Sequence, residues 1–102
     1  AHGMLGLSTT AVYKPGVVPT FGRAAMLGTN PIAFAAPGRR NRPFLLDIAT
    51  STVAMGKLKL AAREGKPLPE GYALDPQGRA QTDAARAYAD RLMTPLGGTR
   101  LM

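Results

Sequence analysis

The segment Ile32–Gly65 reads IAFAAPGRRNRPFLLDIATSTVAMGKLKLAAREG, and it sets the order of structure in the chain. Ile32–Ala36 and Phe44–Ile48 are short apolar runs bounded by turn residues, a pattern that favours two buried strands. The loop between them contains Pro-Gly, so we expect a hairpin. The spacing of apolar residues then becomes helical, which predicts a helix over Thr52–Glu64.

This predicted helix has signals at both ends. Thr50 or Ser51 can cap its N-terminus by accepting a backbone N–H bond. Gly65 suits the left-handed conformation that ends helices, and Gly56 inside the helix would permit a close approach to another element. Four apolar residues share one face at helical spacing: Ala54, Leu58, Ala61 and Ala62.

The flanking segments carry weaker signals. Gly3–Val12 has the Thr and Val content of a strand, and Tyr13–Gly22 is a Pro- and Gly-rich extended loop. Asp75–Gly78, with the sequence DPQG, has the chemistry of a β-turn. Thr82 can cap a second helix, and residues 93–102 are expected to form a loop. The inward face of that helix is predicted to contain Ala85, Tyr88, Ala89 and Leu92.

Length and composition are typical of one small globular domain, with 102 residues, 45% of them hydrophobic and 19% charged. The chain has no cysteine, which excludes disulfides and cysteine-based metal sites. Its longest apolar runs are far shorter than the roughly 20 residues that a membrane helix needs. No secretory signal opens the sequence. We therefore expect a cytoplasmic protein without a membrane segment.

The formal net charge is +7, and residues 1–46 contain basic side chains but no acidic one. The only basic cluster, Arg39-Arg40-Asn41-Arg42, falls in the hairpin loop. It is either a solvated loop or a contact for a phosphate or another anion. A small basic module that binds an anionic partner such as nucleic acid is therefore the alternative function. No aromatic residue interleaves the cluster, so base stacking has no support.

The residues do not compose a catalytic or metal site by themselves. The only histidine, His2, is next to the terminus, and no spaced set of His and carboxylates is present. Asp47 ends an apolar strand directly before the expected helix cap. Its carboxylate either accepts bonds from nearby backbone N–H groups or lines a ligand site at the strand end and helix N-terminus. In the corner before Pro31, that proline biases Asn30 toward an extended backbone.

Motifs along nearly the whole chain point to one family. They read AHGMLGLSTT (1–10), VPTFGRAAMLGTNPIAFAAPG (18–38), PFLLDIATSTVAMGKLKLAAREGKPLPEGYALDPQG (43–78), TD (82–83) and TPLGG (94–98). In order and spacing they resemble the malate/L-lactate dehydrogenase family of the second type. That group reduces 2-oxo acids or imines with NAD(P)H, and it includes ureidoglycolate, sulfolactate and diketogulonate enzymes.

The resemblance implies an α+β fold, with a mixed, largely antiparallel sheet and two main helices, distinct from a Rossmann fold. Residues 1–102 would be part of the family's cofactor-binding domain. Five residues at the strand end are expected to contact the nicotinamide cofactor, NAD or NADP: Leu46, Asp47, Ile48, Ala49 and Thr50. Three residues of the corner are expected beside the active-site pocket: Gly28, Thr29 and Asn30. A further cofactor contact falls near Val12 or Tyr13.

The resemblance also implies what this chain lacks. The family's catalytic histidine and a substrate-binding arginine lie upstream, and a His-Lys-Gly-Tyr-Gly motif follows TPLGG. Neither His2 nor Arg100 matches these motifs. We therefore expect the central part of a homodimeric dehydrogenase for a small 2-hydroxy or 2-oxo acid, without a catalytic residue, a metal or a nucleic-acid partner. Alone it should be inactive, and its residues select neither NAD over NADP nor one acid.

Overall fold

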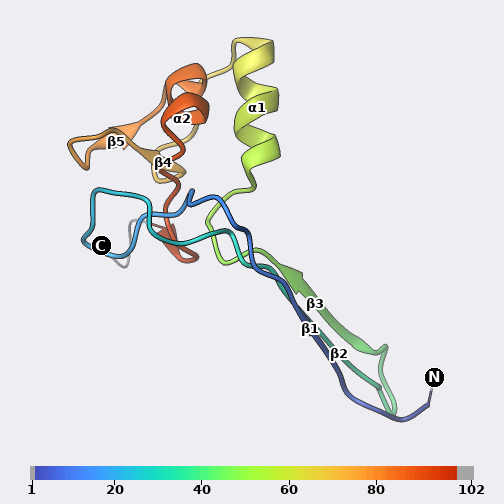
Figure 1. Cartoon of the computed structure of the whole chain (residues 1–102). Coiled ribbons are helices and arrows are strands. Elements are labelled where there is room, and N and C mark those ends of the chain that lie inside the picture. Colours follow the sequence, from blue (N-terminus) through green and yellow to red (C-terminus); the bar gives the residue numbers. More distant parts are fainter. Residues whose placement is uncertain (1, 99–102) are drawn as a thin grey trace.

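The computed structural model describes residues 2–98 and shows a small body from which a β-sheet arm extends (Figure 1). The principal extents of the chain are 48 × 28 × 26 Å. Along the chain the elements are β1 (Gly6–Thr9), β2 (Ile32–Ala36), β3 (Phe44–Ile48), α1 (Met55–Glu64), β4 (Ala73–Leu74), β5 (Ala80–Gln81) and α2 (Ala84–Asp90). Two helices and antiparallel sheets confirm the predicted α+β class.

The arm is a three-stranded antiparallel sheet in the order β1-β2-β3. Leu7 pairs with Phe34, and Phe34 pairs with Leu46, which fixes the register across all three strands. Both β2 and β3 have the predicted bounds, and the predicted hairpin between them is confirmed. The rings of Phe34 and Phe44 pack with centroids 6.1 Å apart.

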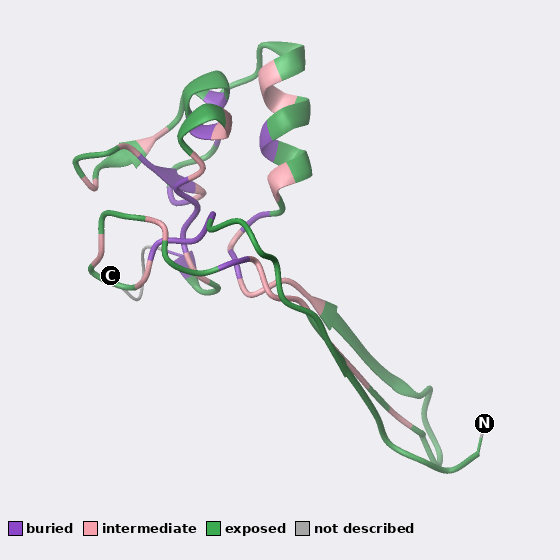
Figure 2. Cartoon of the chain, in the orientation of Figure 1, coloured by how far each residue is buried: buried purple, intermediate pink, exposed green. Residues whose placement is uncertain are grey.

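The prediction that these strands are buried is wrong for this chain. Ile32 is 37% exposed, Phe44 56% and Leu45 75%. Figure 2 shows the arm exposed or half-buried along its length, whereas the buried residues gather in the body and at the base of the arm. Both helices lie in the body, beyond the end of the arm, so no helix among residues 2–98 covers either face of the sheet.

The core lies in the body, where α1 packs against α2. Its main cluster consists of Val17, Val53, Leu58, Leu68, Ala73, Ala84, Ala87 and Met93, and a smaller one of Val18, Leu74 and Leu92. The segment 13–22 is irregular, as predicted, but Val17 and Val18 carry it through the core. Val17 belongs to the main cluster and Val18 to the smaller one, so this Pro- and Gly-rich loop packs into both parts of the core.

Helix α1 begins three residues later than predicted, and neither proposed cap is used. Its N-cap is Ala54, which is exposed and accepts no side-chain cap bond. The Ser51 hydroxyl instead donates to the Val53 carbonyl oxygen at 2.7 Å, and Thr50 is engaged elsewhere. The C-terminal prediction is confirmed, because Gly65 has φ 65° and its N–H bonds back to the last turn.

Helix α2 is capped by Asp83 rather than by Thr82. The Asp83 carboxylate accepts the Arg86 backbone N–H at 2.9 Å, so the helix begins at residue 84. Its inward residues are Ala84 and Ala87, with Tyr88 half-buried. The predicted inward residues Ala85 and Ala89 are exposed, and Leu92 is buried beyond the end of the helix.

The predicted DPQG turn joins β4 to β5. The Gly78 backbone N–H donates to the Asp75 carbonyl oxygen at 2.9 Å, and Gly78 has φ 84°. The Asp75 carboxylate accepts the backbone N–H groups of Arg79 and Gln77 and the Arg79 guanidinium. These bonds, the Arg79 backbone N–H foremost, hold the pKa of Asp75 below its ordinary value of 3.8.

Replacing the buried leucine of α1 tests this core. Leu58 is fully buried, whereas Leu60 on the same helix is 44% exposed. We expect Leu58→Ala to lower the free energy of unfolding by about 2–5 kcal/mol, because it leaves a cavity. Leu60→Ala should change it by less than about 1 kcal/mol. Urea denaturation measures both, and equal losses would contradict the assignment of Leu58 to the core.

Candidate functional site

The corner and the strand end that the sequence singled out meet at the base of the arm. The Thr50 backbone N–H donates to the Thr29 carbonyl oxygen at 2.8 Å. The Thr50 hydroxyl also donates there, lying 2.9 Å from the Thr29 oxygen and 3.3 Å from the Asn30 carbonyl oxygen. Two segments separated by 21 positions in the sequence therefore form one structure. We call it the junction, and define it as Gly28–Asn30 together with Thr50.

The side chain of Asn30 joins a third segment to the junction. Its Oδ1 accepts the Val12 backbone N–H at 3.0 Å. Asn30 has φ 27°, so the prediction of an extended backbone before Pro31 is wrong. Bonds to both its side-chain and its carbonyl oxygen outweigh the local preference. Val12, which the family resemblance placed near the cofactor, therefore lies at the junction, while the neighbouring Tyr13 side chain is fully exposed.

Gly28 is buried where this corner is most crowded. A Cβ atom at that position would lie 2.6 Å from Asn30 Oδ1 and 2.6 Å from the Val12 carbonyl oxygen. Carbon atoms do not approach backbone oxygen this closely without displacing it. The corner therefore requires glycine for a close approach between two backbone segments.

The TPLGG segment closes the other side of the junction. The Leu96 N–H donates to the Thr50 carbonyl oxygen at 2.9 Å, and the Thr52 N–H donates to the Thr94 carbonyl oxygen at 3.0 Å. The hydroxyls of Thr52 and Thr94 lie 2.7 Å apart, and Thr94 is fully buried. The predicted loop after residue 93 is thus irregular as far as Gly98, but it is held in the core; residues 99–102 lie outside the described part.

The side chains of the predicted strand-end segment, residues 46–50, do not all lie on the same face of the sheet. Cross-strand pairing places Asp47 beside Ala33 on one face of the arm, whereas Leu46 and Ile48 pair with Phe34 and Ile32 on the other. Ala49 follows as the half-buried residue that connects β3 to Thr50. The predicted segment therefore presents a carboxylate on one face and aliphatic side chains on the opposite one.

The Asp47 carboxylate is exposed, and it makes no hydrogen bond or ion pair within residues 2–98. The interpretation that nearby backbone N–H groups satisfy it is therefore wrong for this part of the chain. Asp47 also does not directly precede α1, because the segment 49–54 passes through the junction before the helix starts. The strand end meets the corner at Gly28–Asn30 instead of the helix N-terminus.

Other candidate groups lie away from the junction. His2 lines a hollow with Pro37 and Pro43 beside the hairpin tip, at the far end of the arm. No group of His, Cys, Asp and Glu that could hold a metal ion occurs between residues 2 and 98. Arg100, which does not match the family's His-Lys-Gly-Tyr-Gly motif, lies outside the described residues.

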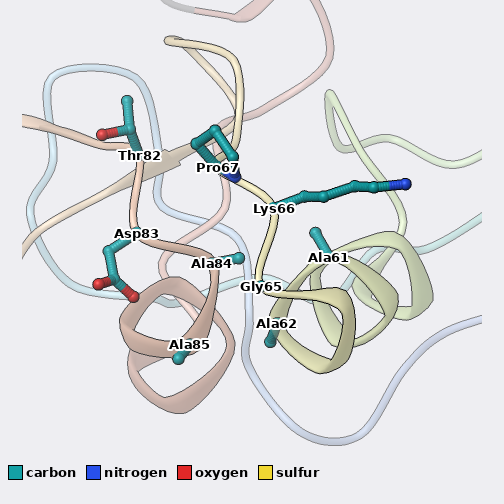
Figure 3. A pocket seen from close by; sticks show the side chains of 9 residues that line it. All are labelled: Ala61, Ala62, Gly65, Lys66, Pro67, Thr82, Asp83, Ala84 and Ala85. Atoms are coloured by element: carbon teal, nitrogen blue, oxygen red, sulfur yellow. The ribbon is translucent and has the colours of Figure 1, made fainter.

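A groove of about 410 Å³ separates the end of α1 from the start of α2 (Figure 3). Alanines and backbone form most of its wall. Its Asp83 carboxylate caps α2, and its Lys66 ammonium lies 2.7 Å from Glu64 and extends away from Asp83. Asp83 and Lys66 thus already have partners within the chain. The groove is therefore a weaker candidate for a ligand site than the junction.

Comparison with known proteins gives a consistent result. A family model described as malate/L-lactate dehydrogenase matches residues 1–100. The malate dehydrogenase of Pyrococcus horikoshii is 47% identical over 97 residues, which is 95% of this chain and 26% of that protein. A Δ1-pyrroline-2-carboxylate reductase of Pseudomonas fluorescens is 41% identical over 93 residues, covering 91% of this chain and 27% of that protein.

Solved structures agree with these matches. The sulfolactate dehydrogenase of Methanocaldococcus jannaschii superposes with a TM-score of 0.81 at 38% identity, over 97% of this chain and 28% of that one. The chain thus spans about a quarter of the length of the relatives that it matches. In the described residues, neither helix has the length and apolar character needed to cross a bilayer.

Two glycine substitutions of opposite expected sign test the crowding at the junction. Gly28→Ala should lower the free energy of unfolding by about 1–3 kcal/mol, because its Cβ would overlap Val12 and Asn30. A Cβ at Gly56 in α1 would meet nothing within 4 Å, so the predicted close approach there is wrong. Gly56→Ala should therefore raise stability by up to about 1 kcal/mol. Thermal unfolding measures both, and a neutral Gly28→Ala would show that the corner is not crowded.

Proposed function

The chain belongs to the malate/L-lactate dehydrogenase family, and we propose that it is part of a longer NAD(P)-dependent oxidoreductase acting on a small 2-hydroxy or 2-oxo acid. The observation that carries the proposal is the family match over residues 1–100, together with a junction that joins the two expected site segments. When bound, NAD or NADP supplies or accepts the hydride. The chain's own residues hold and orient the reactants.

The exposed Asp47 carboxylate is the group best suited to the cofactor. Carboxylate oxygens accept hydrogen bonds, and a nicotinamide nucleotide offers donors in its ribose hydroxyls and carboxamide. On the same face of the arm lie the small residues Ser8 and Ala33, which pair with each other across β1 and β2. Ser8 and Ala33 help to line a shallow hollow of about 280 Å³, and Asp47 lies next to this hollow through its pairing with Ala33. A flat ring can approach such a surface closely, which supports the assignment of Asp47.

The remaining strand-end residues have positioning roles in this proposal. The Thr50 hydroxyl is committed to the carbonyl oxygens of Thr29 and Asn30, so it fixes the corner. Leu46 and Ile48 face the other side of the sheet, where they pair with Phe34 and Ile32. Ala49 carries the chain from the strand into the junction.

Asn30 is suited to face the substrate. The Val12 N–H donates to its Oδ1, which assigns the other atom of the amide as nitrogen. That NH2 group makes no hydrogen bond inside the described part of the chain. We therefore assign the Asn30 amide as a donor to an oxygen of the 2-oxo acid, in a pocket walled by Gly28 and Thr29.

The proton must come from another part of the parent enzyme. The only histidine of this chain, His2, lies by the hairpin tip and away from the junction. Residues 1–102 accordingly form a part of the cofactor-binding domain, and the general acid and the substrate clamp lie elsewhere. The proposal places the parent, a homodimer, in the cytoplasm, which fits a chain without cysteine.

Cofactor affinity of the parent enzyme tests the role of Asp47. Asp47→Ala should weaken binding of NADH or NADPH about tenfold or more, because hydrogen bonds to a charged group contribute about 1.5–3 kcal/mol. Asp90→Ala, at an exposed carboxylate at the end of α2, is the matched control and should leave the Kd unchanged. Titration of the cofactor's fluorescence measures both variants. Equal affinities for wild type and Asp47→Ala would remove Asp47 from the site.

The isolated 102-residue chain provides a second test. With NADH or NADPH and pyruvate or oxaloacetate it should give no turnover, because no general acid lies at its junction. Absorbance at the nicotinamide band measures the rate. Any steady-state turnover that the purified chain itself produces would contradict the assignment of the proton donor to another part of the parent.

A further inference from the structure

Three residues form one row across the face of the arm that carries Asp47. Ser8 of β1 pairs with Ala33 of β2, and Ala33 pairs with Asp47 of β3. Directly paired residues of an antiparallel sheet point to the same side, so these three side chains share one face. The row therefore has a hydroxyl at one edge of the sheet, a methyl group in the middle and a carboxylate at the other edge.

The two polar groups of this row are too far apart to bond to each other. Neighbouring strands are about 4.8 Å apart, which separates the Cα atoms of Ser8 and Asp47 by about 10 Å. Both residues are exposed, and neither side chain makes a hydrogen bond within residues 2–98. Each side chain is therefore available to a ligand group that lies on the face between them.

The next row toward the hairpin tip is apolar. It consists of Gly6, Ala35 and Leu45, which pair across the three strands on the same face. The hollow of about 280 Å³ is lined by this whole row and by Ser8. Glycine and alanine leave its floor low, whereas Leu45, which is 75% exposed, stands beside it. An apolar ring can lie against such a floor while its substituents reach the two polar groups of the first row.

A nicotinamide nucleotide has polar groups on two sides of one ring. The ring nitrogen carries a ribose with donor hydroxyls. A ring carbon carries the carboxamide, which donates through its NH2 group and accepts through its oxygen. An ionised carboxylate only accepts hydrogen bonds, so Asp47 suits the ribose hydroxyls. A hydroxyl both donates and accepts, so Ser8 suits the carboxamide.

We propose that Ser8 is a cofactor-binding residue whose hydroxyl bonds to the carboxamide of the nicotinamide ring. The inference rests on the proposed function, because it requires the cofactor to lie against the Asp47 face of the arm. It adds an orientation: the ring lies across the strands over Ala33, with its ribose toward β3 and its carboxamide toward β1. Ser8 then limits the rotation of the ring about its bond to the ribose.

Two ligands that differ in the nicotinamide test this assignment in the parent enzyme. NADH and NADPH carry the carboxamide, whereas ADP-ribose and its 2′-phosphate form keep both riboses and lack the nicotinamide. Ser8→Ala should raise the Kd of the reduced cofactor about three- to tenfold, because a hydrogen bond between neutral groups is lost. It should leave the Kd of the matching ADP-ribose unchanged. Cofactor fluorescence measures the first affinity, and displacement of the cofactor measures the second.

Two further variants control for effects on the strand. Thr9 is exposed and pairs with Ile32 on the opposite face of the arm. Thr9→Val removes a hydroxyl from the same strand with little change in shape, so it should change neither affinity. Ser8→Thr keeps a hydroxyl at position 8 and should bind the reduced cofactor more tightly than Ser8→Ala does. A loss of cofactor affinity in Thr9→Val equal to that in Ser8→Ala would overturn the assignment of Ser8.

Asp47→Ala separates this inference from the proposed function. It should weaken the binding of both ligands, because both carry the ribose. An unchanged cofactor Kd in Ser8→Ala, beside a raised one in Asp47→Ala, would overturn the role of Ser8 alone. Equal losses of both ligands in Ser8→Ala would also overturn it, since the carboxamide would then not be the group that Ser8 contacts. Unchanged affinities in Asp47→Ala would contradict the Asp47 site, whereas a selective loss in Ser8→Ala would still support Ser8.

Discussion

The backbone of Thr50 is the point on which both halves of the structure depend. Its N–H bonds to the corner at Thr29, and its carbonyl oxygen accepts the N–H of Leu96. One residue thus links the base of the arm to the segment that runs through the core. Thr29 and Thr50 are half-buried, so breaking the bond between them would leave polar atoms with little access to water. The orientation of the arm relative to the body follows from this constraint.

Local pattern predicted the longer elements of the fold, whereas the first strand is shorter than the predicted Gly3–Val12 and the short strands β4 and β5 were not predicted. The apolar runs at 32–36 and 44–48 give β2 and β3 their bounds, and Gly65 ends α1, because such signals act within a few residues. Burial could not be predicted in the same way. An apolar run indicates that a strand packs against another element. It does not show whether that element lies within the same 102 residues, because tertiary structure decides this.

The predictions of the helix N-caps were wrong for a related reason. Thr50 and Ser51 are good capping residues by type, but their hydroxyls donate to carbonyl oxygens instead: Thr50 to the distant Thr29 and Ser51 to the nearby Val53. Asn30 shows the same competition, because its bonds to Val12 and Thr50 hold a backbone that the following proline disfavours. The site was predictable as two motifs from family resemblance. The resemblance also marked Val12 and the 94–96 segment, but no local pattern shows that their backbone bonds to the corner and to Thr50.

The order of the junction's partners along the chain has a consequence for synthesis. The corner and Thr50 leave the ribosome early, but the N–H that closes the other side of Thr50 belongs to Leu96. The β2–β3 hairpin can form as soon as its strands emerge, whereas its base is sealed only after another 46 residues have followed Thr50. During that interval the nascent arm is free to pivot about its base. The geometry of the junction is therefore set late, at the time when the core closes around Met93 and Thr94.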